Sequence, residues 1–156
     1  MKAPLITLAV AGAIAGPAFA QAGEVTLSTT LKDYSGRKAY LAIYLTDAQG
    51  HYQKTLYVAG KKPKYYRHLR DWAHGSGLNP SEFDGLSGAS VGGGDNLTVS
   101  AQIADNLIDA GYEIRIDSAV EDQQENGAEV KVPLTLAGAG KAVAGSGYVG
   151  SFSYKL

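Results

Sequence analysis

The chain contains no cysteine among its 156 residues. It can therefore form no disulfide bond, and it offers no thiolate for a redox pair, a soft metal site or a nucleophile. An exported protein of this composition must be stabilised by its hydrophobic core alone. Exported chains without cysteine fit a bacterial periplasm better than a eukaryotic secretory route.

The chain also contains no apolar run long enough to span a bilayer. The only extended one, residues 3–16, is shorter than the roughly 20 residues that span a bilayer, and no stop-transfer pattern follows it. Lys2 precedes this run, and Ala18-Phe19-Ala20 follows it with the small residues that signal peptidase requires. A membrane anchor is the less favoured interpretation. The pattern predicts a cleaved signal peptide over residues 1–20 and a periplasmic mature chain over residues 21–156, without a transmembrane segment.

Net charge is almost absent, at -1, but the two halves differ strongly. Residues 1–70 contain ten Lys/Arg and three Asp/Glu, whereas residues 71–156 contain four and twelve, so the halves carry +7 and -8. If the fold interleaves the halves, these charges compensate one another. If it separates them, a basic end and an acidic end result, which suits docking to a charged partner.

Alternation of apolar and polar residues dominates the remaining chain and is typical of half-buried strands. We expect strands over residues 25–31, 39–45, 52–58, 97–103, 112–120, 130–136 and 148–156. Asn126-Gly127 predicts a tight turn, and Pro133 predicts an edge position for its strand. This pattern predicts one all-β domain, an immunoglobulin-like β-sandwich of about seven or eight strands.

Residues 63–74 break the alternation and predict a short helix. Tyr65, Leu69 and Trp72 follow one another at helical spacing, Pro63 suits the first turn and Gly75 suits the end. This segment carries the only tryptophan of the chain.

The same segment supplies the best candidates for partner binding, because basic residues alternate there with aromatic ones. We assign this role to Lys64, Tyr66, Arg67, Arg70 and Trp72. In the alternative interpretation the aromatic residues pack on the sandwich and the charges are only solvated. Export and an isoelectric point near 6.3 argue against nucleic acid as the partner.

The three histidines are weak candidates for a metal site. His68 and His74 are six residues apart, which places them about 120° from one another around a helix, and His51 lies in a distant turn. The acidic residues from Asp117 to Glu129 do not have the spacing of a calcium loop. The glycine-rich residues 85–94 lack the ending of a phosphate-binding loop, and no motif frames a catalytic serine, so we expect no enzyme and no cofactor.

Several segments resemble a known family. They are Tyr40-Leu41-Ala42-Ile43-Tyr44-Leu45-Thr46-Asp47, Lys64-Tyr65-Tyr66-Arg67-His68-Leu69-Arg70-Asp71-Trp72, Gly85-Leu86-Ser87-Gly88-Ala89-Ser90 and residues 110–121. In order and content they resemble the predicted periplasmic proteins grouped as domain of unknown function 2271. The resemblance implies a fold similar to the immunoglobulin-like domain of flagellar hook-assembly scaffolds, and a setting beside PepSY-type inner-membrane proteins of iron acquisition or flavin-dependent electron transfer.

Together these observations favour a non-enzymatic periplasmic accessory protein that docks to an inner-membrane partner. The alternative is a carrier of haem, iron or copper that uses His51, His68 and His74. Convergence of the three histidines in the fold would favour this alternative.

Overall fold

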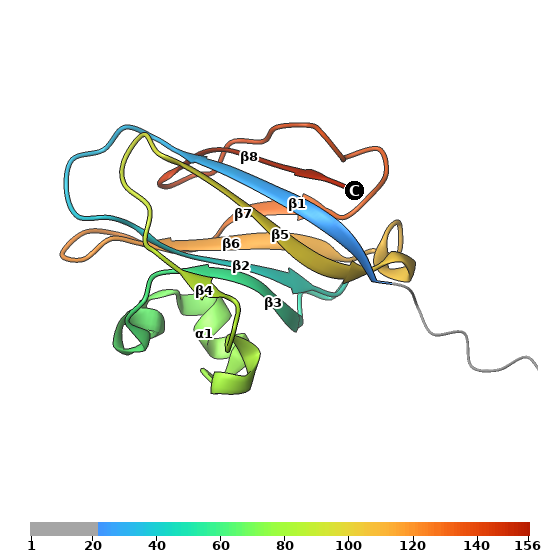
Figure 1. The fold of residues 1–156 in the computed structure, drawn as a ribbon, viewed down its shortest axis with the longest axis horizontal. Coiled ribbons are helices and arrows are strands. Elements are labelled where there is room, and N and C mark those ends of the chain that lie inside the picture. Colours follow the sequence, from blue (N-terminus) through green and yellow to red (C-terminus); the bar gives the residue numbers. More distant parts are fainter. Residues whose placement is uncertain (1–21) are drawn as a thin grey trace, which may run out of the picture.

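Two stacked β-sheets form the part of the protein that the computed structural model describes, residues 22–156 (Figure 1). One sheet has the strand order β5-β1-β8 and the other the order β4-β3-β2-β6-β7. The strands are β1 (Ala22–Leu31), β2 (Tyr40–Thr46), β3 (Tyr52–Ala59), β4 (Ser87–Gly88), β5 (Asn96–Ala104), β6 (Glu113–Ala119), β7 (Glu125–Pro133) and β8 (Val149–Lys155). The predicted all-β sandwich is thus confirmed. The predicted signal peptide, residues 1–20, lies outside the described residues.

The main core fills the space between the two sheets. Leu41, Ile43 and Leu45 of β2 are buried there, as their alternation with polar or outward residues predicts. They face Val25 and Leu27 of β1, which belong to the opposite sheet. Burial of these aliphatic side chains between the layers is the main stabilising contribution that a chain without disulfides has.

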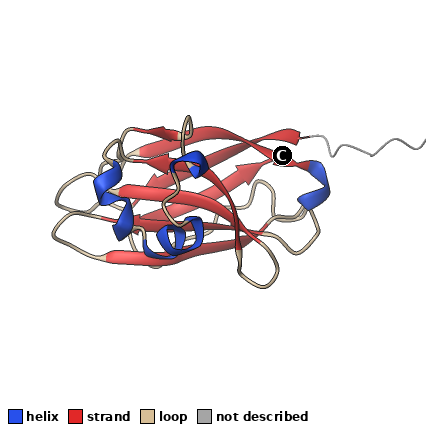
Figure 2. Ribbon diagram, turned by 90° about the horizontal axis from the view of Figure 1, so that it is seen from below, coloured by secondary structure: helices blue, strands red, loops and turns tan. Residues whose placement is uncertain are grey.

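A second layer covers the outer face of the five-stranded sheet. Figure 1 shows α1 (Arg70–Ser76) and its neighbouring helical turns on the side of this sheet away from β1, β5 and β8, and Figure 2 shows them in front of the strands. The turns are η1 (Pro63–His68) and η2 (Pro80–Glu82), and a further turn, η3 (Asp105–Leu107), lies elsewhere. Because this layer is present, all residues of β2 after Tyr40 are buried, on both faces of the strand.

The predicted helix over residues 63–74 is in fact two short elements. η1 is a 3-10 helix, Leu69 interrupts it with φ -85° and ψ 78°, and α1 follows. The helix ends at Gly77, which adopts the left-handed conformation with φ 64°, and not at Gly75. In this geometry Tyr66 and Leu69 are buried together with Trp72, whereas Tyr65 is only half-buried.

The predicted turn at Asn126-Gly127 is wrong. Both residues lie inside β7, and the β6–β7 connection is made by residues 120–124, with Asp122 at φ 61°. Gly127 is instead a point of close approach, because a Cβ atom there would lie 2.9 Å from the Asp71 carboxylate of α1. The prediction for Pro133 is confirmed, since it ends β7, an edge strand.

The basic and acidic halves of the chain are interleaved. β1 lies between β5 and β8, and β2 pairs with β6, so each sheet contains strands of both halves. Arg37 and Glu121 form an ion pair at 2.9 Å across the halves. The structure thus has the interleaved arrangement, in which the charges of the two halves compensate one another, and not a basic end and an acidic end. Among residues 22–156 no helix has the length and apolar character needed to cross a membrane.

Candidate binding site

The outer layer is fixed to the sheet by aromatic side chains. Trp72 is fully buried, and its indole N–H donates to Thr55 Oγ1 of β3 at 2.9 Å. The hydroxyl of Tyr66, also buried, donates to the Gly60 carbonyl oxygen at 2.7 Å. The two rings are 5.5 Å apart in an edge-to-face arrangement, and Phe83 completes the cluster 5.1 Å from Tyr66.

The burial of Tyr66 and Trp72 corrects their expected role. A partner cannot contact side chains that are at most 1% exposed. They hold residues 63–76 on the sheet. This agrees with the alternative interpretation of the sequence, in which the aromatic residues pack on the sandwich. Lys64, Arg67 and Arg70 point away from the sheet and are exposed, so these three remain candidates for contact.

A buried carboxylate adds a polar attachment. Asp117 of β6 accepts hydrogen bonds from the backbone N–H of Trp72 at 2.7 Å, the backbone N–H of Ala128 at 2.6 Å and the hydroxyl of Tyr44 at 2.8 Å. Burial raises the pKa of Asp117 above its ordinary value, and the three hydrogen bonds oppose this shift only in part. One side chain thus joins α1, β2, β6 and β7.

Five cations lie in the segment that leads into η1, in η1 itself and at the start of α1, and we call them the basic ridge. Its members are Lys61, Lys62, Lys64, Arg67 and Arg70. All five are exposed. Arg70 lies 3.9 Å from Glu125, while the other four form no ion pair with any carboxylate of residues 22–156. The ridge therefore presents largely uncompensated positive charge to solvent.

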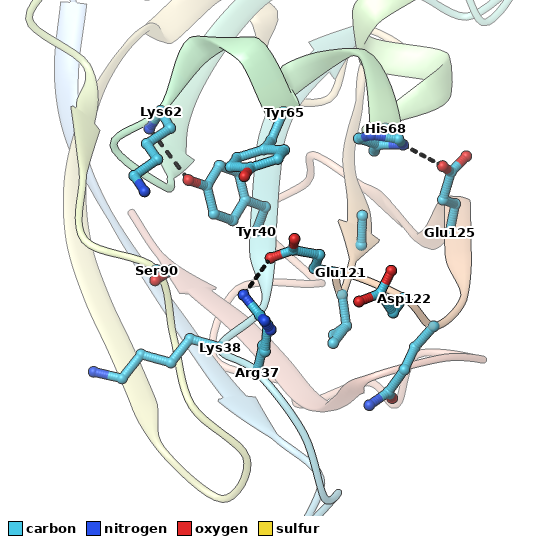
Figure 3. A pocket seen from close by; sticks show the side chains of 13 residues that line it. Arg37, Lys38, Tyr40, Lys62, Tyr65, His68, Ser90, Glu121, Asp122 and Glu125 are labelled. Carbon is cyan, nitrogen blue, oxygen red and sulfur yellow. Dashed lines mark hydrogen bonds and ion pairs between the residues drawn. The ribbon is translucent and has the colours of Figure 1, made fainter.

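A groove of about 600 Å³ runs between the ridge and the β6–β7 connection (Figure 3). Tyr40 and Tyr65 line it, with ring centroids 5.8 Å apart and planes at 87°. The Tyr40 hydroxyl accepts a hydrogen bond from the backbone N–H of Lys62 at 3.2 Å, which fixes the start of η1. His68 and Glu125 are hydrogen-bonded to one another at the far end.

The groove brings together segments that are distant in the sequence. Ala39 and Val91 form an antiparallel bridge with both side chains in the core. Their neighbours Tyr40 and Ser90 therefore lie opposite one another on the other side of the chain, where both line the groove. The sequence does not identify Arg37, Lys38, Tyr40 and Ser90 as site residues, because no local pattern indicates that they meet the segment 62–68.

The three histidines do not converge. His68 lines the groove, whereas His51 and His74 line a second pocket of about 520 Å³ together with Tyr44 and Asp71. Within residues 22–156 no three His, Asp or Glu side chains are grouped in a way that could hold a metal ion. Of the acidic residues, Asp117 and Glu129 are buried and accept hydrogen bonds from the protein itself.

The fold is that of a small β-sandwich. Helical segments cover the outer face of its five-stranded sheet, and a charged groove lies beside them. The chain belongs to the family described as Predicted periplasmic protein (DUF2271), whose family model matches residues 22–151. This description agrees with the periplasmic location that the sequence predicts. No curated protein and no solved structure matches the chain, so the likeness to the immunoglobulin-like domain of hook-assembly scaffolds stays a prediction.

Proposed function

We propose that the protein is a non-enzymatic periplasmic binding module that docks to an acidic segment of an inner-membrane protein through the basic ridge. The observation that carries this proposal is the division of one short segment into two sides. Its aromatic side is buried on the sheet, and its cationic side is exposed with four of five charges unpaired among the described residues.

Rigid attachment favours binding by this surface. A segment that is fixed before binding loses little conformational entropy on association, so more of the interaction energy appears as affinity. Arginine is effective in such surfaces, since its guanidinium pairs with a carboxylate through two hydrogen bonds. Arg67 and Arg70 are thus the expected principal contacts, and Lys64 adds attraction at longer range.

The resemblance of the sequence to its family supports an inner-membrane partner of the PepSY type, in an iron or electron-transfer setting. The charge of the ridge supports the partner's chemistry: the docking segment should be rich in Asp and Glu. Electrostatic attraction of this kind speeds association and selects the partner.

Photo-crosslinking in the periplasm tests this proposal. A photoreactive residue is placed at Lys64, and at Lys131 of β7, which is also exposed, as a control. We expect an adduct with an inner-membrane protein at position 64 only, and loss of most of this adduct when Arg67→Glu and Arg70→Glu are combined. The absence of an adduct at position 64, its presence at position 131, or its persistence after charge reversal would contradict the docking surface.

A metal or haem carrier is the second candidate, favoured by one observation. His51 and His74 line the same pocket, together with Tyr44 and Tyr52. The exported protein would then be isolated with bound iron or copper, or with the Soret absorption of haem, and His51→Ala with His74→Ala would remove the bound group. Protein isolated without metal and without a Soret band, and unable to bind added iron, copper or haem, would dismiss this candidate.

A further inference from the structure

The groove beside the basic ridge has a chemical polarity of its own. Lys38, Lys62 and Ser90 lie along one side of it, and Glu121, Asp122 and Glu125 lie along the other (Figure 3). Tyr40 and Tyr65 line the space near Lys62. A ligand that fits such a groove is anionic at one end, aromatic in its body and rich in hydrogen-bond donors at the other end.

Some charged side chains of the groove form ion pairs, whereas others do not. Arg37 is paired with Glu121 at 2.9 Å, and Glu125 is bonded to His68 and lies 3.9 Å from Arg70. Lys38 and Lys62 have no carboxylate within ion-pair distance among residues 22–156. Ser90, whose hydroxyl can donate or accept a hydrogen bond, lies between these two lysines in the view of Figure 3. This end can receive an anion without first breaking an ion pair.

The tyrosines offer a place for a planar ring. Tyr40 is held by its hydrogen bond from Lys62 and by Ala39 in the core, so its orientation is fixed before any ligand arrives. Tyr65 meets it edge to face, and both side chains are half-buried, with surface left for contact. A nucleobase-like ring can stack on such a side chain, and this contact tolerates different bases because each has a planar face.

The size of the groove sets a limit on the ligand. A volume of about 600 Å³ lies in the middle of the range typical of clefts for small molecules and cofactors. This volume accommodates a single ring system with a sugar-like chain and one phosphate. The carboxylates Asp122 and Glu125 then lie where the hydroxyl and ring N–H groups of such a compound need acceptors.

We propose that this groove binds an aromatic phosphate monoester of mononucleotide size. The phosphate lies against the Ser90 hydroxyl between Lys38 and Lys62, and the ring packs on Tyr40 and Tyr65. This inference goes beyond the docking function and does not depend on it. Lys38, Ser90 and Tyr40 are not members of the basic ridge, and of the ridge only Lys62 lines the groove. According to this proposal, a small-molecule site lies on the face of the protein next to η1.

Calorimetric titration of the exported, purified protein tests the proposal with defined probes. Flavin mononucleotide and adenosine monophosphate carry both ring and phosphate, riboflavin and adenosine lack the phosphate, and ribose 5-phosphate lacks the ring. We expect at least one of the two aromatic monophosphates to bind with a dissociation constant below about 0.1 mM. Loss of either its phosphate or its ring should weaken binding at least about tenfold, and the comparison of the two monophosphates identifies the ring.

Variants at Ser90 and Lys38 locate the site. Ser90→Asp places a carboxylate where the phosphate should lie and is expected to abolish binding, whereas Ser90→Ala removes one hydrogen bond and should weaken it only a few-fold. Lys38→Glu should weaken binding at least about tenfold, and the control Lys131→Glu should leave it unchanged. Lys64→Glu with Arg67→Glu reverses two charges of the basic ridge that do not line the groove. It should weaken docking but preserve ligand binding, which keeps the two proposals distinguishable.

Three results would overturn the proposal. The first is the absence of binding of both aromatic monophosphates below about 1 mM. The second is equal binding of riboflavin or adenosine and its monophosphate. The third is equal affinity in the Ser90→Asp variant and the unchanged protein.

Discussion

Asp117 illustrates how far a single side chain can determine the arrangement of a layer. A buried carboxylate without a cationic partner is costly, because transfer from water disfavours its charged form. Asp117 is fully buried and forms no ion pair among residues 22–156, yet three donors from three elements point at it. Two of these donors are backbone N–H groups: that of Trp72 is buried, and that of Ala128 is partly buried.

Replacement of Asp117 by alanine should therefore destabilise the protein by about 2–4 kcal/mol, since it removes the acceptor of two buried donors, the Trp72 N–H and the Tyr44 hydroxyl, and of the partly buried Ala128 N–H. The free energy of unfolding, measured in urea, checks this expectation. Asp84→Ala, at an exposed loop position, is the control and should change it by less than about 0.5 kcal/mol. Equal stability of the two variants would show that Asp117 does not hold the outer layer.

The same carboxyl should make stability depend on pH in a defined direction. Burial raises the pKa of Asp117 above the ordinary value of 3.8, so the folded protein binds this proton more tightly than the unfolded chain. The resulting stabilisation is complete below pH 3.8 and is lost as the pH rises through the folded-state pKa.

Asp117→Asn supplies the reference, since asparagine does not titrate. The free energy of unfolding of the unchanged protein minus that of this variant should fall as the pH is raised from below 4 toward neutrality. Urea unfolding at a series of pH values measures this difference. A difference that grows with pH would mean that hydrogen bonds to the carboxylate outweigh its burial.

The sequence predicts the side of the strand on which Asp117 lies, but not its surroundings. Alternation correctly places it opposite Ile114 and Ile116, which face the main core. The usual expectation for that side is solvent, and only the long-range packing of α1 on the sheet turns it into an interior. Trp72 and Tyr66 were predicted as contact residues for the same reason: local spacing does not say which aromatic residues find a surface to cover.

The segment from Gly60 to Ser76 depends on its entry point as much as on its helices. Gly60 has φ 132°, a region that other residues rarely adopt, and its carbonyl oxygen accepts the Tyr66 hydrogen bond. A Cβ atom at this position would lie 2.3 Å from the ring of Tyr40. Glycine is thus required here for both backbone conformation and space.

Gly60→Ala should cost about 2–5 kcal/mol of stability, since backbone strain and overpacking both contribute. Gly140→Ala is the matched control, because Gly140 also has a positive φ, 78°, but no atom within 4 Å of the Cβ position. The control should cost only about 1–2 kcal/mol. Thermal unfolding of both variants measures the contrast, and equal losses would show that Tyr40 does not close over Gly60.

The helical segment was predicted to exist but with the wrong internal geometry. The spacing of Tyr65, Leu69 and Trp72 suggested one continuous helix, whereas Tyr66 takes the buried position. Local spacing thus favours the wrong one of these two adjacent tyrosines. The hydrogen bond of Tyr66 to Gly60, and the edge-to-face contact of Tyr65 with Tyr40, separate them only after the sheet has formed.

The protein as a unit is more predictable than its site. Strand alternation, the absence of cysteine and a single helical interruption suffice to predict a one-domain β-sandwich. The groove could not be predicted, because its walls come from residues 37–40, 62–68, 90 and 119–125, which only the interleaved strand order brings together. Because the strands of the two halves are neighbours, the positive charge of the first half and the negative charge of the second compensate one another over most of the molecule. The basic ridge remains as a local excess of positive charge.

Residues 61–76 form a cover whose aromatic side is buried on the sheet and whose cationic side is exposed. The most direct measurement is the fluorescence of Trp72, the only tryptophan, in the native protein with iodide as quencher. A fully buried indole should emit at the short wavelengths of an apolar environment and resist quenching until the protein unfolds. Emission at the wavelength of tryptophan in water, with free quenching under native conditions, would show that the segment does not cover the sheet.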